Sequence, residues 1–322
     1  MMHQITLPSI ARSFLIRKLL TKLFWRWETQ RKYQIRQRAF NLPPIPVNAN
    51  PTTVLAVLTT PSTICDAAWA AQSLLNYLPA EIGLTIVVDG ELPATTIENL
   101  KVLFPGIILN FTRTLLEEIR SIAPKTAQLG DYHPMGRKLG TILSLQQKYN
   151  LLYSDADILC FGEMPEISQA LKTNSEIGLY LQDIGKVQIE PITLERVHSL
   201  GLEYASTINV GFLYIPQNSL EIGIAEQLLD DGKEISSWFP DTMILSVLMQ
   251  QAKAKPLPRS RYVVSAQRQF YFEEDVCYDQ IAVRHFITPV RHLMYSKGMP
   301  KLLPQLQRQM YKLIYGTKIS RV

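Results

Sequence analysis

The sequence predicts an α/β fold in which a mostly parallel central sheet carries helices on both faces. Short apolar runs alternate with helical patterns from residue 54 onward, beginning with Val54–Leu58, a helical pattern through Leu78 and the run Leu84–Val88. The chain has 322 residues and 47% apolar content, which is enough to bury one large core. We therefore expect one large domain with appendages at its ends.

The remaining elements follow in the same alternating order. The pattern predicts helices at Thr95–Phe104, Arg137–Tyr149 and Asp241–Gln251, strands at Ile107–Phe111, Leu151–Ser154, Ile177–Leu181 and Ile208–Ile215, and a loop from Pro124 to Gly136. Gly211 interrupts the last strand pattern, which indicates a bulge or a close approach of the backbone to a ligand.

Both ends of the chain differ from its body. Residues 1–40 hold nine Lys or Arg and one Glu, net +8, so the other 282 residues carry about −3 of the chain's +5. Residues 41–51 include four prolines, which indicates a stiff extended connector. We predict a basic helical extension with its connector at 1–50, a catalytic domain at 51–300 and a basic C-terminal helical tail at 301–322.

The basic segment at residues 10–27 has the pattern of an amphipathic helix. Its apolar residues share one face, and aromatic side chains lie among Lys and Arg. Such a helix either packs on the body or binds an anionic membrane surface. Because the basic residues belong to a tail, we expect no nucleic-acid partner. We expect a cytoplasmic protein, peripheral on a membrane if the second alternative holds, because no apolar run reaches eighteen residues.

Asp155 and Asp157 are the strongest chemical signal in the sequence. They follow the apolar run 151–154 directly, and a second apolar run begins at Ile158. Ionised carboxylates between apolar flanks are costly to desolvate, and a divalent cation that prefers oxygen ligands, Mn²⁺ or Mg²⁺, compensates them. The alternative is a purely structural loop in which the two carboxylates only cap a helix or a turn.

Two more predicted strands end in polar residues. Thr59 follows the first strand and Asp89 the second. In open parallel sheets, ligands bind outside the carboxyl ends of the strands. We therefore expect Thr59, Asp89 and Asp155 to meet at one edge and to bind a cofactor or substrate there.

Five segments together resemble a known family. They are Arg137-Lys138-Leu139, Leu152-Tyr153-Ser154-Asp155-Ala156-Asp157-Ile158, Ile208-Asn209-Val210-Gly211, Asp241-Thr242-Met243-Ile244-Leu245 and His285-Phe286. In this order they resemble the GT-A glycosyltransferases, whose sheet is Rossmann-like, and in particular family 8 with its glycogenin-like and lipopolysaccharide galactosyltransferase members. The resemblance covers roughly residues 54–295 and implies transfer of a sugar from a nucleotide-diphosphate donor, typically a UDP-sugar, to an acceptor hydroxyl on a glycan, lipid or protein.

The resemblance also implies roles for single residues. Asp155, Asp157 and His285 would hold Mn²⁺ or Mg²⁺, with His292 and His133 as rivals of His285. Arg137 would lie near the donor diphosphate or sugar. The sugar pocket would be lined by Asn209 and Gly211, and the acceptor side by Asp241 and Thr242. A structural alternative stays open for several of them: Arg137 in a surface ion pair, Asn209 in a turn, Asp241 as a helix cap.

Two departures from the family pattern bear on catalysis. Thr242 stands where the family has Gln, which leaves open whether the transfer retains or inverts the anomeric configuration. The late family signature, His-x-x-Gly-x-x-Lys-Pro-Trp, has here Thr288 for Gly, Arg291 for Lys and no Pro-Trp. Arg291 keeps a cation for the leaving phosphate and can bind it bidentately.

Two other classes remain as alternatives. A phosphatase of the haloacid dehalogenase type also places an Asp-x-Asp pair after a strand, but there it follows the first strand of the domain. A catalytically decayed, membrane-associated scaffold on the same fold is the non-enzymatic alternative. Metal-dependent nucleotide binding would separate the scaffold from an enzyme.

Overall fold

The structure is a computed structural model, which describes residues 32–187, 189–229, 240–264 and 276–306. The amphipathic segment at 10–27 and most of the predicted C-terminal tail lie outside the described residues. Within the described part, no helix combines the length and apolar character needed to cross a bilayer.

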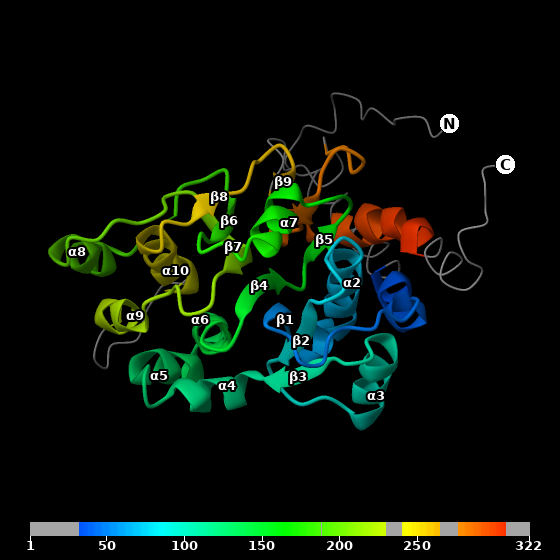
Figure 1. Cartoon of the computed structure of the whole chain (residues 1–322), viewed down its shortest axis with the longest axis horizontal. Helices are drawn as coiled ribbons and strands as arrows, with labels where there is room; N and C mark the ends of the chain where they lie inside the picture. The colour runs from blue at the N-terminus through cyan, green and yellow to red at the C-terminus, as the bar shows by residue number, and fades with distance from the viewer. Residues whose placement is uncertain (1–31, 188, 230–239, 265–275, 307–322) are drawn as a thin grey trace, which may run out of the picture.

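A seven-stranded sheet forms the centre of the molecule (Figure 1). Its spatial order is β3 (Ile108–Phe111), β2 (Gly83–Val88), β1 (Thr53–Thr59), β4 (Asn150–Asp155), β7 (Ile208–Ile215), β6 (Leu179–Gln182) and β8 (Lys255–Pro256). Strands β3, β2, β1 and β4 are parallel, whereas β7 runs antiparallel to both β4 and β6. The predicted mostly parallel α/β sheet is confirmed.

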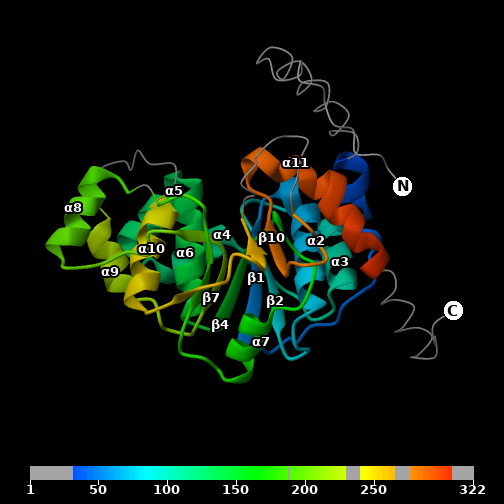
Figure 2. The ribbon, with the colours of Figure 1, turned by 90° about the horizontal axis from the view of Figure 1, so that it is seen from above.

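Helices cover both faces of this sheet (Figure 2). The described α-helices of the molecule are α2 (Ile64–Leu75), α3 (Ala94–Leu103), α4 (Thr112–Ile119), α5 (Pro124–Tyr132), α6 (Pro134–Gln146), α7 (Pro165–Lys172), α8 (Pro191–Ser199), α9 (Ile222–Leu228), α10 (Pro240–Gln251) and α11 (Arg291–Leu293). Successive side chains of a strand point to opposite faces. Leu55 and Val57 of β1 accordingly pack in the core with α2 and α3, and Val54 and Ala56 in the core with α4, α6 and α10.

The segment 124–136 does not form the predicted loop. It contains α5 and the start of α6. Pro124 is the first residue of α5, where a missing N–H costs nothing, and the carboxylate of Glu226 accepts hydrogen bonds from the N–H groups of Lys125 and Thr126. Gly130 lies inside the helix because Leu116 packs against it, leaving no space for a Cβ. Contacts remote in sequence therefore outweigh the local Gly and Pro signals.

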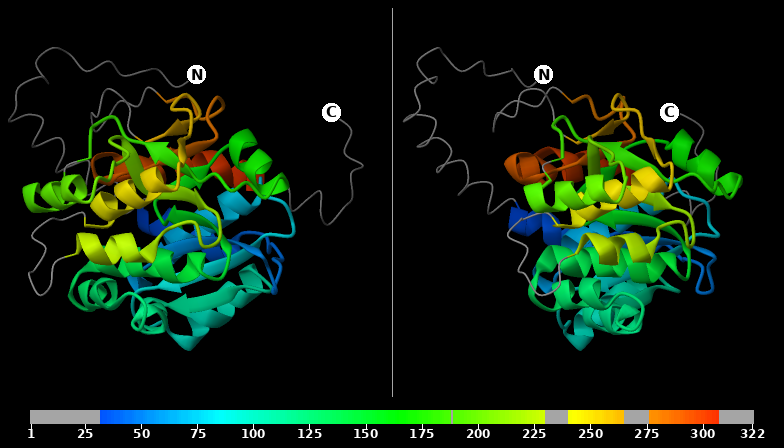
Figure 3. Two further views of the ribbon diagram at one scale, coloured as in Figure 1. Left: turned by 60° about the vertical axis from the view of Figure 1, so that its left-hand side comes forward. Right: turned by 90° about the vertical axis from the view of Figure 1, so that its left-hand side faces the viewer.

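The two described ends of the chain lie together on the α2 face (Figures 2 and 3). Residues 32–37 are helical and lead into a short 3-10 turn, Arg38–Asn41. Arg36 and Tyr295 both bind the buried carboxylate of Asp66 in α2, at 2.7 Å and 3.1 Å. Residues 43–48 have no regular secondary structure, and the N–H groups of Ile45 and Val47 donate to the carbonyls of Leu103 and Pro105. The stiff connector and the division of the chain into three parts stay predictions.

Candidate functional site

Three potential metal ligands converge beyond the carboxyl end of β4. One donor atom each from Asp155, Asp157 and His285 lies within 4.8 Å of the others. The Nε2 atom of His285 is 3.2 Å from Asp157 Oδ1 and 3.9 Å from Asp155 Oδ2. Asp157 and His285 are buried, and Asp155 is partly exposed. One histidine and two carboxylates in this arrangement form a mixed nitrogen and oxygen donor set for a divalent cation.

A second, small sheet brings His285 to this point. It consists of β5 (Ile158–Cys160), β10 (Val283–His285) and β9 (Tyr262–Val263), and its register pairs His285 with Ile158, the residue after Asp157. The N–H of Phe286 also donates to the carbonyl of Asp157 at 2.9 Å. The two rivals lie elsewhere: His133 caps α6 by accepting from the N–H of Met135, and His292 lies in α11, outside the cluster.

Two cationic side chains already neutralise the carboxylates. Lys138 Nζ lies 2.9 Å from Asp155 Oδ2, and Arg291 donates to Asp157 Oδ2. Burial by itself raises the pKa of Asp157, but His285, Arg291 and Lys138 outweigh burial and bring this pKa well below its usual range. Asp157 is therefore ionised at any physiological pH.

Lys138 is a site residue that the sequence reasoning missed. It is 5% exposed, and its Nζ also lies 3.6 Å from Asp241 Oδ2 and 5.3 Å from the centre of the Tyr153 ring. Burial tends to lower its pKa, but Asp155 and Asp241 outweigh burial and raise it, so the ammonium stays charged. Lys138 lies just over one turn into α6, beside Arg137, and the signal for it in the sequence was its place in the segment Arg137-Lys138-Leu139.

Asp241 and Thr242 lie in the first turn of α10. Asp241 is 1% exposed, and burial raises the pKa of its carboxyl, an effect that Lys138 partly offsets. Its Oδ1 atom has no hydrogen-bond partner within the described ranges. Thr242 is partly buried beside it. Lys138 thus connects Asp241 to the carboxylate pair, and the acceptor-side role of Asp241 and Thr242 stays a prediction.

Asn209 and Gly211 face His285 from β7. The strand bulges here, since Tyr180 pairs with Leu213 while the next residue, Leu181, pairs with Asn209. Asn209 Oδ1 lies 2.9 Å from His285 Nδ1, and a Cβ on Gly211 would lie 2.4 Å from Cε1 of that ring. The close approach expected at Gly211 is therefore made by a protein side chain. Whether either residue also lines a sugar pocket stays a prediction.

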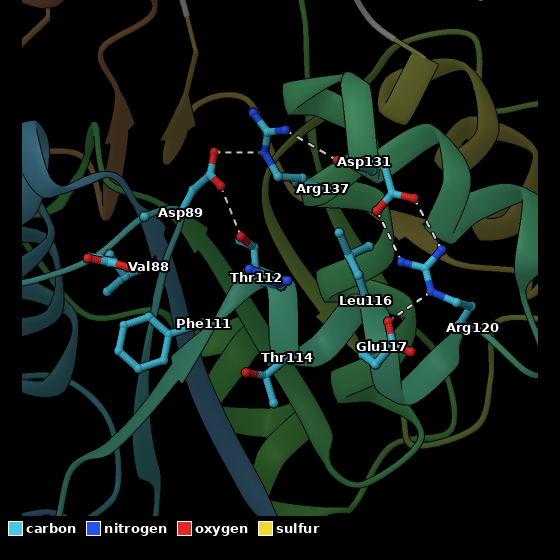
Figure 4. Close-up of a pocket in the computed structure, with 14 residues that line it drawn as sticks. Val88, Asp89, Phe111, Thr112, Thr114, Leu116, Glu117, Arg120, Asp131 and Arg137 are labelled. Atoms are coloured by element: carbon cyan, nitrogen blue, oxygen red, sulfur yellow. Dashed lines mark hydrogen bonds and ion pairs between the residues drawn. The ribbon is translucent and has the colours of Figure 1, made fainter.

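Thr59, Asp89 and Asp155 lie at one edge of the sheet, as expected. The register pairs Leu58 with Asp155 and Thr59 with Val88, the residue before Asp89. Asp89 accepts hydrogen bonds from Thr112 at 2.9 Å and from Arg137 at 2.8 Å, as Figure 4 shows. Thr59 Oγ1 is 3.0 Å from Thr63 Oγ1.

Asp89 and Arg137 line a hollow of about 720 Å³ beyond the ends of β2 and β3 (Figure 4). Its lining also includes Phe111, Thr112 and Arg113, but none of the three potential metal ligands. Arg137 therefore points to this hollow, while the neighbouring Lys138 points to the carboxylate pair. This hollow and the ligand cluster lie at the same carboxyl edge of the sheet.

No protein-family model matches the sequence, and no curated protein matches it. Several solved structures are similar. Mouse xyloside xylosyltransferase 1 in its apo form is 11% identical, with 76% of this chain and 99% of that chain covered and a TM-score of 0.48. The galactosyltransferase LgtC in complex with donor and acceptor sugar analogues is 14% identical, with 80% and 96% covered and a TM-score of 0.45. GlyE of Streptococcus pneumoniae TIGR4 is 10% identical, with 85% and 67% covered and a TM-score of 0.47. These three solved structures are glycosyltransferases.

Proposed function

We propose that this protein is a metal-dependent glycosyltransferase that moves a sugar from a nucleotide-diphosphate donor, in the first instance a UDP-sugar, to an acceptor hydroxyl. The observation that carries the proposal is the convergence of Asp155, Asp157 and His285 at the carboxyl edge of a parallel sheet, where such folds bind ligands. The resemblance of the sequence to GT-A glycosyltransferases supports the choice of reaction.

The donor set fits a hard divalent cation. Two carboxylates and one imidazole form a mixed oxygen and nitrogen donor set that suits Mn²⁺ or Mg²⁺. Asp155, Asp157 and His285 would hold the cation, which would supply positive charge for the diphosphate leaving group as the bond between sugar and phosphate breaks. His285 would bind through Nε2, the ring nitrogen that faces both carboxylates.

Arg291 and Lys138 supply the protein's own positive charge. Arg291 lies at the carboxylate pair, is partly exposed and can hold a phosphate oxygen while it keeps its contact with Asp157. Negative charge on a diphosphate leaving group increases toward the transition state, so a fixed cation beside it lowers the barrier. Lys138 is buried, and it would hold Asp155 and Asp241 in place rather than leave them for the substrate.

The hollow beside the cluster suits the nucleoside half of the donor. Asp89 offers carboxylate oxygens to ribose hydroxyls, and Thr59 stands between the hollow and Asp155 at the same sheet edge. The acceptor would approach from the side of Asp241 and Thr242. The acceptor is a hydroxyl on a glycan, lipid or protein. A membrane surface on which the enzyme could meet a lipid acceptor is the role predicted for residues 10–27, which lie outside the described residues.

Thermal-shift measurements test this proposal. UDP-, GDP- and dTDP-sugars are added with and without Mn²⁺, and at least one should raise the melting temperature only with the metal present, because diphosphate and carboxylates repel each other without it. Asp155→Ala and Asp157→Ala should each remove this shift. Lys148→Ala, which changes an exposed ion pair with Glu118, is the control.

The outcomes separate the alternatives. No shift with any nucleotide sugar and metal would favour the decayed scaffold. A shift that persists in the double variant Asp155→Ala/Asp157→Ala would show that the pair does not bind the donor. Release of UDP from a UDP-sugar by the wild-type protein, lost in Asp157→Ala, would support the enzyme.

A further inference from the structure

Three residues outside the ligand cluster hold the ring of His285 in place. They are Asn209 and Gly211 of β7 and Asp183, which follows β6, and we call them the seat of His285. Asn209 Oδ1 accepts the N–H of Gly211 at 3.0 Å, and Asn209 Nδ2 donates to Asp183 Oδ2 at 3.2 Å. A backbone N–H can only donate and a carboxylate can only accept. These two neighbours therefore fix the orientation of the Asn209 amide without reference to His285.

This orientation decides which nitrogen of His285 carries a proton. Asn209 Oδ1 lies 2.9 Å from His285 Nδ1, and an oxygen acceptor at that distance requires a proton on Nδ1. In the neutral ring Nε2 then holds the lone pair, and Nε2 is the atom that faces Asp157 and Asp155. Two carboxylates and this lone pair directed at one point form a donor set for a divalent cation; in the metal-free protonated ring, a second proton on Nε2 would face Asp157 instead.

Steric fit supports the same seat. A Cβ on Gly211 would lie 2.4 Å from Cε1 and 2.6 Å from Nδ1 of His285, so only glycine lets the ring lie against β7. Asn209 and Gly211 are two residues apart in β7 and therefore share the face of the strand that meets the ring. Asp183 follows the carboxyl end of β6, and Asp183 Oδ1 also accepts the N–H of Ile184 at 2.7 Å, so its carboxylate is itself held.

We infer that Asn209, oriented by Asp183 and Gly211, is a positioning residue that fixes the Nδ1–H tautomer of His285 and thereby presents Nε2 to a divalent cation. The inference rests on the proposed function, and it gives Asn209 a role that acts through the metal ligand rather than through a sugar. Partners that donate or accept behind a metal-binding histidine typically change metal affinity by 10- to 100-fold when they are removed.

Calorimetric titration with Mn²⁺, without nucleotide, measures the effect on the metal alone. Asn209→Ala should weaken Mn²⁺ binding by roughly 10- to 100-fold. The double variant Asn209→Asp/Asp183→Asn keeps an acceptor for Nδ1–H and restores an amide donor to the bond between positions 209 and 183, so its Mn²⁺ affinity should stay within a few-fold of wild type. Gly211→Ala should weaken binding because it displaces the ring. The matched control is Asn110→Ala, a partly buried asparagine of β3 whose amide bonds Thr85 instead.

Long-range ¹H–¹⁵N NMR of the metal-free protein reads the tautomer directly. The signals of the His285 ring are assigned by their absence from the spectrum of His285→Gln. At alkaline pH the wild-type ring should carry its proton on Nδ1, and in Asn209→Ala a larger fraction of rings should carry it on Nε2. A wild-type ring protonated on Nε2 would overturn the inference.

The two proposals fail in different ways. Unchanged Mn²⁺ affinity in Asp155→Ala would remove the proposed metal site itself. Loss of Mn²⁺ binding in Asp155→Ala but not in Asn209→Ala would overturn only the seat. Weaker donor binding at saturating Mn²⁺ in both Asn209→Ala and Asn209→Asp/Asp183→Asn, with Mn²⁺ affinity unchanged, would return Asn209 to a sugar-contacting role.

Discussion

At the scale of single residues, Lys138 determines the charge balance of the site. Its ammonium is buried between Asp155 and Asp241, and both carboxylates would lose their nearest cation with it. Removing one partner of a buried ion pair leaves an uncompensated charge that costs several kcal/mol. The free energy of unfolding therefore depends on Lys138 far more than on an exposed lysine.

We predict that Lys138→Met lowers the free energy of unfolding by about 3 kcal/mol or more in urea titrations without metal. Mn²⁺ should restore part of this loss, because the divalent cation compensates the charge of Asp155 in place of Lys138. Adding Mn²⁺ should therefore raise the free energy of unfolding more in Lys138→Met than in wild type. Lys148→Met should change stability by less than about 1 kcal/mol, because its pair with Glu118 is exposed. Equal losses in the two variants would contradict this role of Lys138.

At the scale of elements, α5 depends on a cap supplied from another helix. Glu226 of α9 accepts from Lys125 N at 2.8 Å, from Thr126 N at 2.9 Å and from Thr126 Oγ1 at 2.6 Å. These bonds satisfy N–H groups that no helix can satisfy internally, and the negative charge lies at the positive end of the helix dipole. The segment forms a helix because α9 packs beside it.

Glu226→Ala is expected to lower the free energy of unfolding by about 2 kcal/mol, the upper range for loss of a helix cap. Chemical denaturation measures this, and hydrogen exchange should show faster exchange confined to α5. Glu221→Ala, at an exposed position before α9 with no capping hydrogen bond, should be near neutral. A neutral Glu226→Ala would mean that α5 is stable without the cap.

At the scale of the whole molecule, Asp66 holds together three segments that are far apart in sequence. Its carboxylate binds Arg36 from the N-terminal helix and Tyr295 near the C-terminus, and Lys32 lies 5.0 Å from the centre of the Tyr295 ring. Burial raises the pKa of Asp66, and Arg36 and Tyr295 oppose that rise. The described part of the basic extension is thus docked on the body.

Asp66→Ala should release both ends at once. We expect faster hydrogen exchange, measured by mass spectrometry, in residues 32–41 and 291–298, with the amides of β4 unchanged. Asp279→Ala removes only an exposed pair with Lys301 and should leave both segments as in wild type. Faster exchange in one segment alone would show that Asp66 does not couple them.

Local sequence patterns predicted the alternating elements and the edge at which Thr59, Asp89 and Asp155 lie, but they left His292 as a rival of His285. Only the pairing of β10 with β5 in the tertiary structure brings His285 rather than His292 to the two carboxylates. Strand periodicity and polar strand ends are local properties, so they can be read without coordinates. Neighbouring helix positions differ by about 100°, so the sequence could not decide whether Arg137 or Lys138 turns toward the carboxylates. That choice, like the helix at 124–132, follows from packing of α6 against α4 and α5.

The direction of β7 was also decided by tertiary structure, because an antiparallel strand and a parallel one have the same apolar pattern when buried on both faces. Only this direction brings Asn209 and Gly211, at the start of β7, to the same edge as the end of β4 and behind His285.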